Sequence, residues 1–131
     1  MTEMSNLFQT ADWKTEKHVP VIESPDVLKK GVYSKISISV GKEIAHPNKT
    51  EHHISWIEVY FLPAGEKFPS QISRAEFCAH GASAQGPDTS MVYTNHEISL
   101  SFKTDKPGTI IACSLCNIHG LWQSSKEIKI E

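Results

Sequence analysis

The stretch ISWIEVYFL, residues 54–62, carries apolar and aromatic side chains on both faces of an extended chain. Residues 109–115, TIIACSL, have the same character. This composition is typical of strands that are covered on both sides, because a strand with one face in water alternates apolar and polar residues. We therefore expect these two segments to form the central strands of a β-sheet.

Other segments follow the two-residue period of half-buried strands. Residues 33–40 place isoleucine and valine on one face and serine on the other, and residues 98–102 alternate similarly. Two more strands are expected at 72–79 and 126–130. Turn-forming residues separate these segments, at Pro63-Ala64-Gly65, Gly81, Gly86-Pro87-Asp88 and Pro107-Gly108. The pattern predicts an all-β fold, an immunoglobulin-like antiparallel β-sandwich of about seven strands, with a closed barrel as the alternative.

The length and the absence of internal divisions predict one domain. A chain of 131 residues can bury a core without disulfides, and no repeat, low-complexity tract or linker interrupts it. We expect residues 13–131 to form the single domain. Residues 1–12 are expected to be an N-terminal arm that becomes ordered only when something docks it.

Charge and cysteine content exclude several classes of partner. The net charge is −2, from 13 basic and 15 acidic side chains, so no basic face suggests nucleic acid or an anionic membrane. No run of eighteen apolar residues and no secretory signal is visible. Three cysteines are too few for the disulfide framework of a small secreted domain. We expect a soluble, cytoplasmic protein in which Cys78 and Cys113 pack as small core residues.

Candidate metal ligands are concentrated in a few short motifs. CNIHG at residues 116–120 sets a thiol and an imidazole three residues apart, with a glycine following. Upstream, EKH at 16–18, His46 and the pair at 52–53 add a carboxylate and further imidazoles. Sulfur with several imidazoles suits iron, copper or zinc, whereas calcium and magnesium prefer oxygen ligands. Because loops at one end of a sandwich can converge, we expect the metal site there.

Strand geometry narrows these candidates. Neighbouring side chains on a strand point to opposite faces, so at most one of His52 and His53 should face the metal, and spacing does not choose between them. The same parity separates Cys113 from Cys116. Two further histidines lack ligand-type neighbours and are expected to be surface or structural residues: His80 and His96.

The number of candidate ligands favours iron. Structural zinc sites are closed and four-coordinate, whereas four imidazoles and a thiolate make five ligands. A blue-copper site uses an axial methionine after the second histidine, but the last methionine here, Met91, precedes Cys116. Four imidazoles with an axial thiolate would leave one position of Fe(II) open to a small oxidant. The alternatives are a cupredoxin-like electron carrier and a non-enzymatic module with an incidental zinc ion.

Three motifs together resemble superoxide reductases of the single-iron neelaredoxin class, in the desulfoferrodoxin family. They are EKHVP at 16–20, HPN followed by EHHI within 46–54, and CNIHG at 116–120. The resemblance implies an oxidoreductase that reduces superoxide by one electron to hydrogen peroxide, at a mononuclear non-haem iron with one iron per chain. It runs from about Trp13 to the C-terminus.

The resemblance also implies a role for each site residue. The metal ligands would be one thiolate and four imidazoles, from Cys116, His18, His46, His52 and His119. Glu16 matches a carboxylate that binds the iron in its ferric state. Lys17 matches the lysine that attracts superoxide and helps to protonate the peroxide.

The family further implies an external electron donor of the rubredoxin type and a homotetramer. No cysteine precedes Cys78, so we do not expect the additional four-cysteine iron domain of desulfoferrodoxins. Ala45 stands where relatives often have proline before the histidine-proline pair, which would loosen the loop that carries His46.

Overall fold

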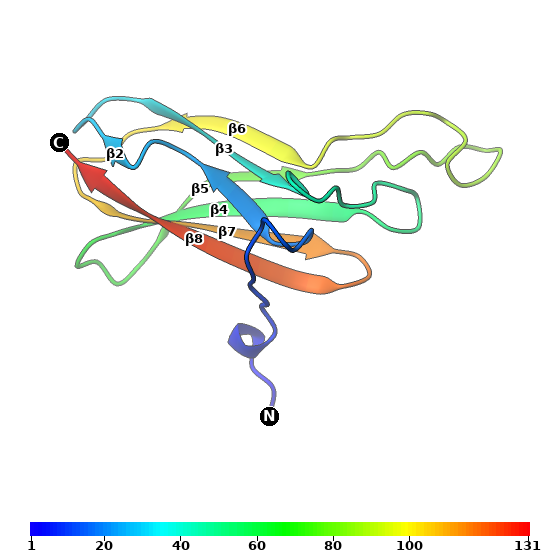
Figure 1. Ribbon diagram of the computed structural model, residues 1–131, viewed down its shortest axis with the longest axis horizontal. Coiled ribbons are helices and arrows are strands. Elements are labelled where there is room, and N and C mark those ends of the chain that lie inside the picture. The colour runs from blue at the N-terminus through cyan, green and yellow to red at the C-terminus, as the bar shows by residue number, and fades with distance from the viewer.

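Two strands form the middle of the larger sheet in the computed structural model, which describes residues 1–131 (Figure 1). They are β4 (Ile54–Pro63) and β7 (Gly108–Cys116), which pair antiparallel with Ile57 opposite Ser114. Each has another strand on its far side, so the prediction of two central strands is confirmed.

Six more strands complete two sheets: β1 (Pro20–Glu23), β2 (Val27–Leu28), β3 (Ser34–Val40), β5 (Ser70–Glu76), β6 (Glu97–Phe102) and β8 (Gly120–Ile130). The five-stranded sheet has the order β2-β8-β7-β4-β5, and the three-stranded sheet has the order β1-β3-β6. The predicted β-sandwich is confirmed. A closed barrel is wrong, because both sheets keep free edges.

The core lies between the sheets. Ile36 and Ile38 of β3 are buried, and Ile57 and Val59 of β4 belong to the same cluster of 15 buried residues. Full burial of such a side chain stabilises the fold by about 1.5–3 kcal/mol. The sandwich is therefore a firm support for the loops at its ends.

Two details differ from the sequence prediction. The short strands β1 and β2 were not expected, and β2 pairs in parallel with β8, with Val27 opposite Lys129. β8 also begins at Gly120 instead of residue 126, because the hairpin after β7 aligns the polar residues that follow with the β7 backbone. Pro20 is the first residue of β1, a strand position where the missing amide hydrogen is tolerated.

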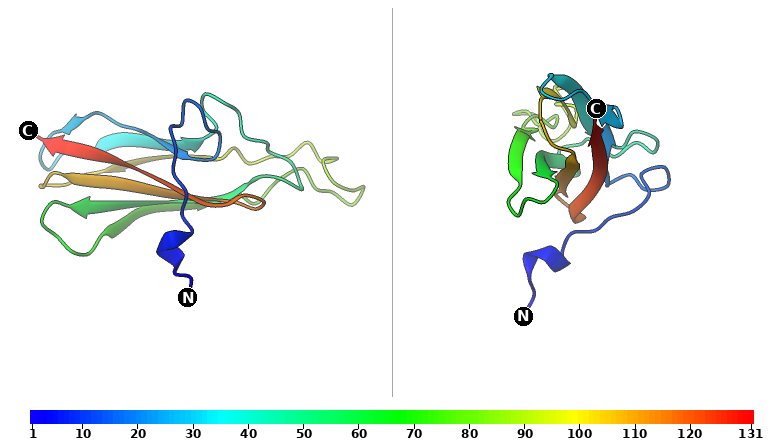
Figure 2. Two further views of the ribbon diagram at one scale, coloured as in Figure 1. Left: turned by 60° about the horizontal axis from the view of Figure 1, so that its bottom comes forward. Right: turned by 90° about the vertical axis from the view of Figure 1, so that its left-hand side faces the viewer.

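The N-terminal arm projects from the body of the sandwich (Figure 2). It contains the only helical turn, η1 (Met4–Asn6), and it meets β8 at Gln9, whose amide donates to the Leu121 carbonyl at 3.0 Å. No helix has the length and apolar character needed to cross a membrane. Cys78 is exposed and Cys113 is half-buried, so the expectation that Cys78 packs in the core is wrong.

Candidate metal centre

Three chain segments bring the candidate ligands to the end of the sandwich that lies away from the C-terminus (Figure 1). His18 lies just before β1, and His46 and His52 belong to the loop between β3 and β4. Cys116 ends β7, and His119 immediately precedes β8. The predicted convergence of loops at one end is what the structure shows.

The four imidazole rings form a closed cycle. Adjacent ring centroids are 4.8 Å apart for His18 and His46, and 4.9 Å for His46 and His52. The distances are 5.1 Å for His52 and His119 and 4.7 Å for His119 and His18. Across the cycle, His18 and His52 are 6.5 Å apart. These near-equal spacings suit four nitrogen ligands around one ion.

The spacing of the donor atoms fits a single ion. One donor atom from each of His18, His52, Cys116 and His119 lies within 4.8 Å of the others. Cys116 Sγ is 3.7 Å from His119 Nδ1. Metal–nitrogen bonds of about 2.0–2.1 Å and metal–sulfur bonds of about 2.3 Å put opposite donors roughly 4–4.5 Å apart.

Two orphaned nitrogens support the same conclusion. Nε2 of His46 and Nε2 of His52 are buried without any hydrogen-bond partner. Buried polar atoms nearly always have a partner, and an imidazole nitrogen facing three other imidazoles has a metal ion as its natural one. The residues present therefore fit a transition metal, and iron is among the metals that imidazole and thiolate ligands bind.

The orientation of His46 is set by its own loop. Nδ1 donates to the Pro47 carbonyl at 2.6 Å, which leaves the Nε2 lone pair available for a metal. Gly41 makes room for this loop, since a Cβ there would lie 2.5 Å from the His46 amide nitrogen. Burial, reinforced by neighbouring imidazoles, lowers the pKa of His46 to about 4. The ring is therefore neutral near pH 7, as a metal ligand must be.

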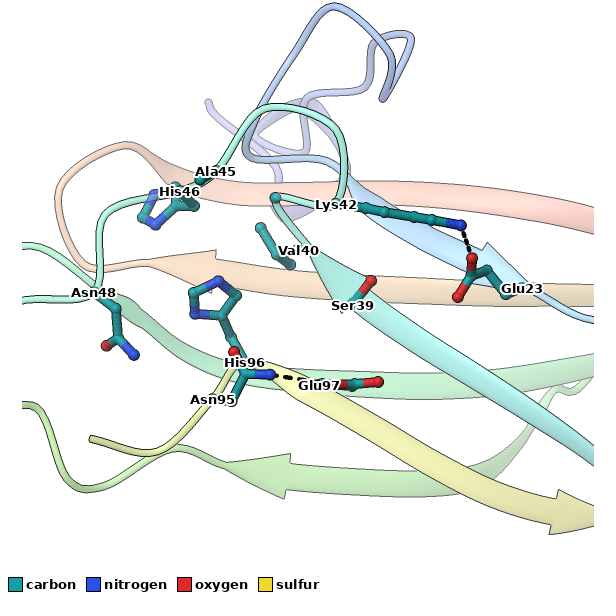
Figure 3. A pocket seen from close by; sticks show the side chains of 11 residues that line it. Glu23, Ser39, Val40, Lys42, Ala45, His46, Asn48, Asn95, His96 and Glu97 are labelled. Carbon is teal, nitrogen blue, oxygen red and sulfur yellow. Dashed lines mark hydrogen bonds and ion pairs between the residues drawn. The ribbon is translucent and has the colours of Figure 1, made fainter. Parts of the chain in front are cut away.

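His96 lies beside His46, as Figure 3 shows, at the edge of a cavity of about 540 Å³. The two ring centroids are 5.9 Å apart and the rings are nearly perpendicular. His96 is 8% exposed and its Nδ1 has no partner. It is thus a buried neighbour of a candidate ligand, and nothing in its local sequence pattern indicated that position.

His18 is held from two sides. Its Nδ1 is 2.9 Å from Glu16 Oε2, and its ring stacks on Trp122 at 5.0 Å between centroids. The His18 backbone amide donates to the other Glu16 oxygen. Burial raises the pKa of Glu16, but these hydrogen bonds outweigh burial and hold that pKa below its usual value. An ionised Glu16 accepting from Nδ1 directs Nε2 of His18 towards the cluster.

The hairpin at residues 116–120 is tied to the loop that carries His52. Asn117 Oδ1 accepts from the His53 amide at 2.8 Å, and Asn117 Nδ2 donates to the Glu51 carbonyl at 2.9 Å. Gly120 has a φ of +79°, which a glycine adopts without strain. The sequence interpretation missed Asn117, although its place between Cys116 and His119 was a usable signal.

The two adjacent histidines diverge, as expected, although both lie in the loop just before β4 and not in the strand itself. His52 joins the cluster, whereas His53 Nδ1 contacts the Lys49 carbonyl at 2.9 Å and the His53 ring stacks on His80 at 3.5 Å. His80 therefore has the structural role that was expected. Cys113 is outside the cluster, again in agreement with parity.

Neither His46 nor Glu16 belongs to the group of donor atoms that lie within 4.8 Å of one another. Glu16 contacts the outer nitrogen of His18, as described above. Lys17 is half-buried, and its charge is among the causes, after burial and neighbouring histidines, that lower the pKa of His52. All three methionines are exposed, so no thioether lies at the cluster.

A β-sandwich that gathers four imidazoles and one buried thiol at one end has the donor set of a transition-metal site. Residues 10–125 match the desulfoferrodoxin family. The chain is 52% identical over 129 residues to neelaredoxin from Megalodesulfovibrio gigas, covering 98% of this chain and 99% of that one. The chain belongs to the desulfoferrodoxin family.

Two further relatives agree with this assignment. Superoxide reductase from Pyrococcus furiosus is 52% identical over 128 residues, covering 98% of this chain and 99% of that protein. A crystal structure of superoxide reductase (neelaredoxin) from Archaeoglobus fulgidus in the reduced form has a TM-score of 0.87 and 56% identity, over 94% of this chain and 98% of that one. The similarity therefore spans nearly the whole of both chains.

Proposed function

We propose that this chain is a superoxide reductase, an oxidoreductase that converts superoxide to hydrogen peroxide at a single iron bound by four imidazoles and one thiolate. The proposed ligands are His18, His46, His52, His119 and Cys116. The observation that carries the proposal is the closed cycle of four imidazole rings with the buried thiol beside it. The relatives that carry the same activity in their names add independent support.

Iron held by these residues would supply the one electron that superoxide needs, and thiolate donation would enrich the iron in electron density. Cys116 is 1% exposed, and the His119 amide donates to its sulfur at 3.3 Å. This hydrogen bond fixes the position of the sulfur beside the imidazoles. His119, in contrast, is exposed, so the cluster is open to water and to a small anion on that side.

The residues around the cluster have distinct proposed tasks. Glu16 orients His18 and, on leaving its contacts with that residue, would serve as a further carboxylate ligand. Lys17 attracts superoxide and helps to deliver a proton to the product, and Lys49, exposed on the His46 loop, contributes to the local positive potential. Only nearby lysines matter, because the screening length at physiological salt is about 8 Å.

Iron analysis combined with product analysis tests the function. We expect one iron per chain and a visible absorption band that disappears on reduction. The reduced protein should consume superoxide and yield hydrogen peroxide without dioxygen, since a reductase, unlike a dismutase, oxidises none of its substrate. Dioxygen released together with peroxide would contradict the proposal, as would a chain that binds copper in place of iron.

Replacing Lys17 with alanine should slow the second-order reaction with superoxide by about threefold to tenfold and flatten its dependence on salt. The physical reason is the loss of a positive charge close enough to act on His52, in a protein of net charge −2. Pulse radiolysis at several ionic strengths measures both effects. Lys129→Ala, at the opposite end of the sandwich, is the matched control and should change neither. An unchanged rate and salt slope in Lys17→Ala would exclude the proposed role.

We propose a rubredoxin-like protein as electron donor and a homotetramer as the assembly, working in the cytoplasm, where free cysteines stay reduced. Residues 13–131 would be the iron-binding domain and residues 1–12 an arm. Support for self-association comes from that arm, which extends away from the domain and exposes Met4 and Leu7 (Figure 2).

A further inference from the structure

The connection between β5 and β6, residues 77–96, is unusually long for a segment without a strand of its own. Connections of more than about 12–15 residues in a compact domain generally serve a function or are disordered. This one is extended and protrudes at the same end as the candidate metal centre (Figure 1). We refer to it as the 77–96 segment.

Internal contacts give the 77–96 segment a defined shape. The Gly81 amide donates to the Val92 carbonyl at 2.9 Å, and Thr94 donates to the Ala79 carbonyl at 2.8 Å. Gly81 has a φ of +87°, and a Cβ at this position would lie 2.5 Å from the Tyr93 hydroxyl oxygen. That hydroxyl donates to Asp88 Oδ1 at 3.0 Å. The segment thereby presents Asp88 in a fixed orientation.

Asp88 and Thr50 form a reciprocal pair of hydrogen bonds. The Thr50 amide donates to Asp88 Oδ1 at 3.0 Å, and the Asp88 amide donates to Thr50 Oγ1 at 3.0 Å. The Thr50 hydroxyl in turn donates to the His80 carbonyl at 2.6 Å. Asp88 has a φ of +55°, a conformation that aspartate tolerates better than most residues. The Thr50 amide is also the largest cause that lowers the pKa of Asp88.

Thr50 lies between two candidate metal ligands, His46 and His52, in a loop without regular structure. A second attachment lies next to it, where Asn48 Nδ2 donates to the Thr94 carbonyl at 3.1 Å. On the other side of this loop, Asn117 holds residues 51 and 53, as described above. The 77–96 segment and the 116–120 hairpin therefore hold the ligand loop between them.

We propose that the 77–96 segment is a positioning device for the metal centre, in which Asp88 and Thr50 fix the loop that carries His46 and His52 before the metal binds. The inference rests on the proposed ligand set. We call the reciprocal hydrogen bonds between Asp88 and Thr50 the clamp. Without the clamp, the loop would sample many conformations, and metal binding would have to order it. With the clamp, the two imidazoles are already in place, so the metal is held more firmly and released more slowly.

Amide hydrogen exchange of the metal-free full-length chain tests the clamp without relying on activity. In Asp88→Ala, we expect exchange in residues 46–53 to be about tenfold faster, with the strand amides of β4 and β7 unchanged. Asp88→Asn keeps the accepting oxygen and should stay within about twofold of wild type. Asp105→Ala, another exposed aspartate outside this network, is the control.

Iron release to a chelator provides the second measurement. We expect iron release to be about tenfold faster than wild type in Asp88→Ala and in Thr50→Val. Thr50→Ser should release iron at the wild-type rate, because it keeps the hydroxyl. The double variant Asp88→Ala/Thr50→Val should release iron no faster than either single variant. Unchanged exchange in residues 46–53 would overturn the proposal, and so would a uniform increase over all strands, which indicates general destabilisation. A wild-type chain that binds no iron would refute the proposed function, while the exchange experiment would still decide on the clamp.

Discussion

Replacing Cys116 with serine is expected to abolish the sulfur-to-iron charge-transfer absorption of the oxidised, iron-loaded protein. The Cys116 sulfur is buried among the candidate ligands, and no other cysteine belongs to the cluster. Iron affinity should fall by at least about 100-fold, since loss of an outer-shell partner alone typically costs 10- to 100-fold. Visible spectroscopy and competition with a chelator measure the two effects.

Cys113→Ser is the matched control for this experiment. Cys113 lies three residues earlier on β7 and points to the opposite face of the sheet, outside the cluster. Its replacement should leave both the absorption band and the iron affinity close to wild type. A band that persists in Cys116→Ser, or one that is lost in Cys113→Ser, would show that the sulfur ligand has been assigned wrongly.

The pair His52→Ala and His53→Ala is expected to give the second large difference. His52 has a buried Nε2 without a partner and belongs to the cluster, so its removal should lower the affinity for iron by about 100-fold or more. His53 packs on His80 outside the cluster, and its removal should change the affinity by less than about threefold. Chelator competition under anaerobic conditions measures both variants.

Thermal unfolding of the metal-free forms separates ligand loss from misfolding. Both alanine variants remove one half-buried imidazole from the same loop, so their unfolding midpoints should lie within a few degrees of each other. Equal iron affinities for the two variants would contradict the assignment of His52. A larger loss of iron affinity in His53→Ala than in His52→Ala would indicate that His53 is the ligand in place of His52.

Much of the fold could be predicted from the local pattern of side chains. The alternation of residue types in β3 matches its alternating burial, and β4, with apolar residues on both faces, is an inner strand of the larger sheet. The strands β1 and β2 were not predicted. They are only four and two residues long, and side-chain periodicity cannot be recognised over so few residues. The parallel pairing of β2 with β8 depends on packing and has no local signature.

The candidate site, like the fold, could be predicted in part from the sequence. Motif spacing identified His18, His46, Cys116 and His119 as candidates, and parity limited the choice within residues 52–53. Asn117 stood visibly between two motif residues, but its hydrogen bonds to the backbone of residues 51 and 53 could not be read from the sequence. The position of His96 beside His46 was not accessible, because it is a contact between distant parts of the chain. Glu16 illustrates an intermediate case, since its proximity to His18 was visible but its contact with Nδ1 was not.

By itself, the sequence determined that the chain is a β-sandwich with candidate sulfur and imidazole ligands in the motifs of the desulfoferrodoxin family, because strand periodicity and short motifs are local properties of the chain. Only the tertiary structure decided that the four rings form a closed cycle and that the 77–96 segment reaches the ligand loop. These features are contacts between segments far apart in the sequence, and they exist only after the two sheets have packed around their common core.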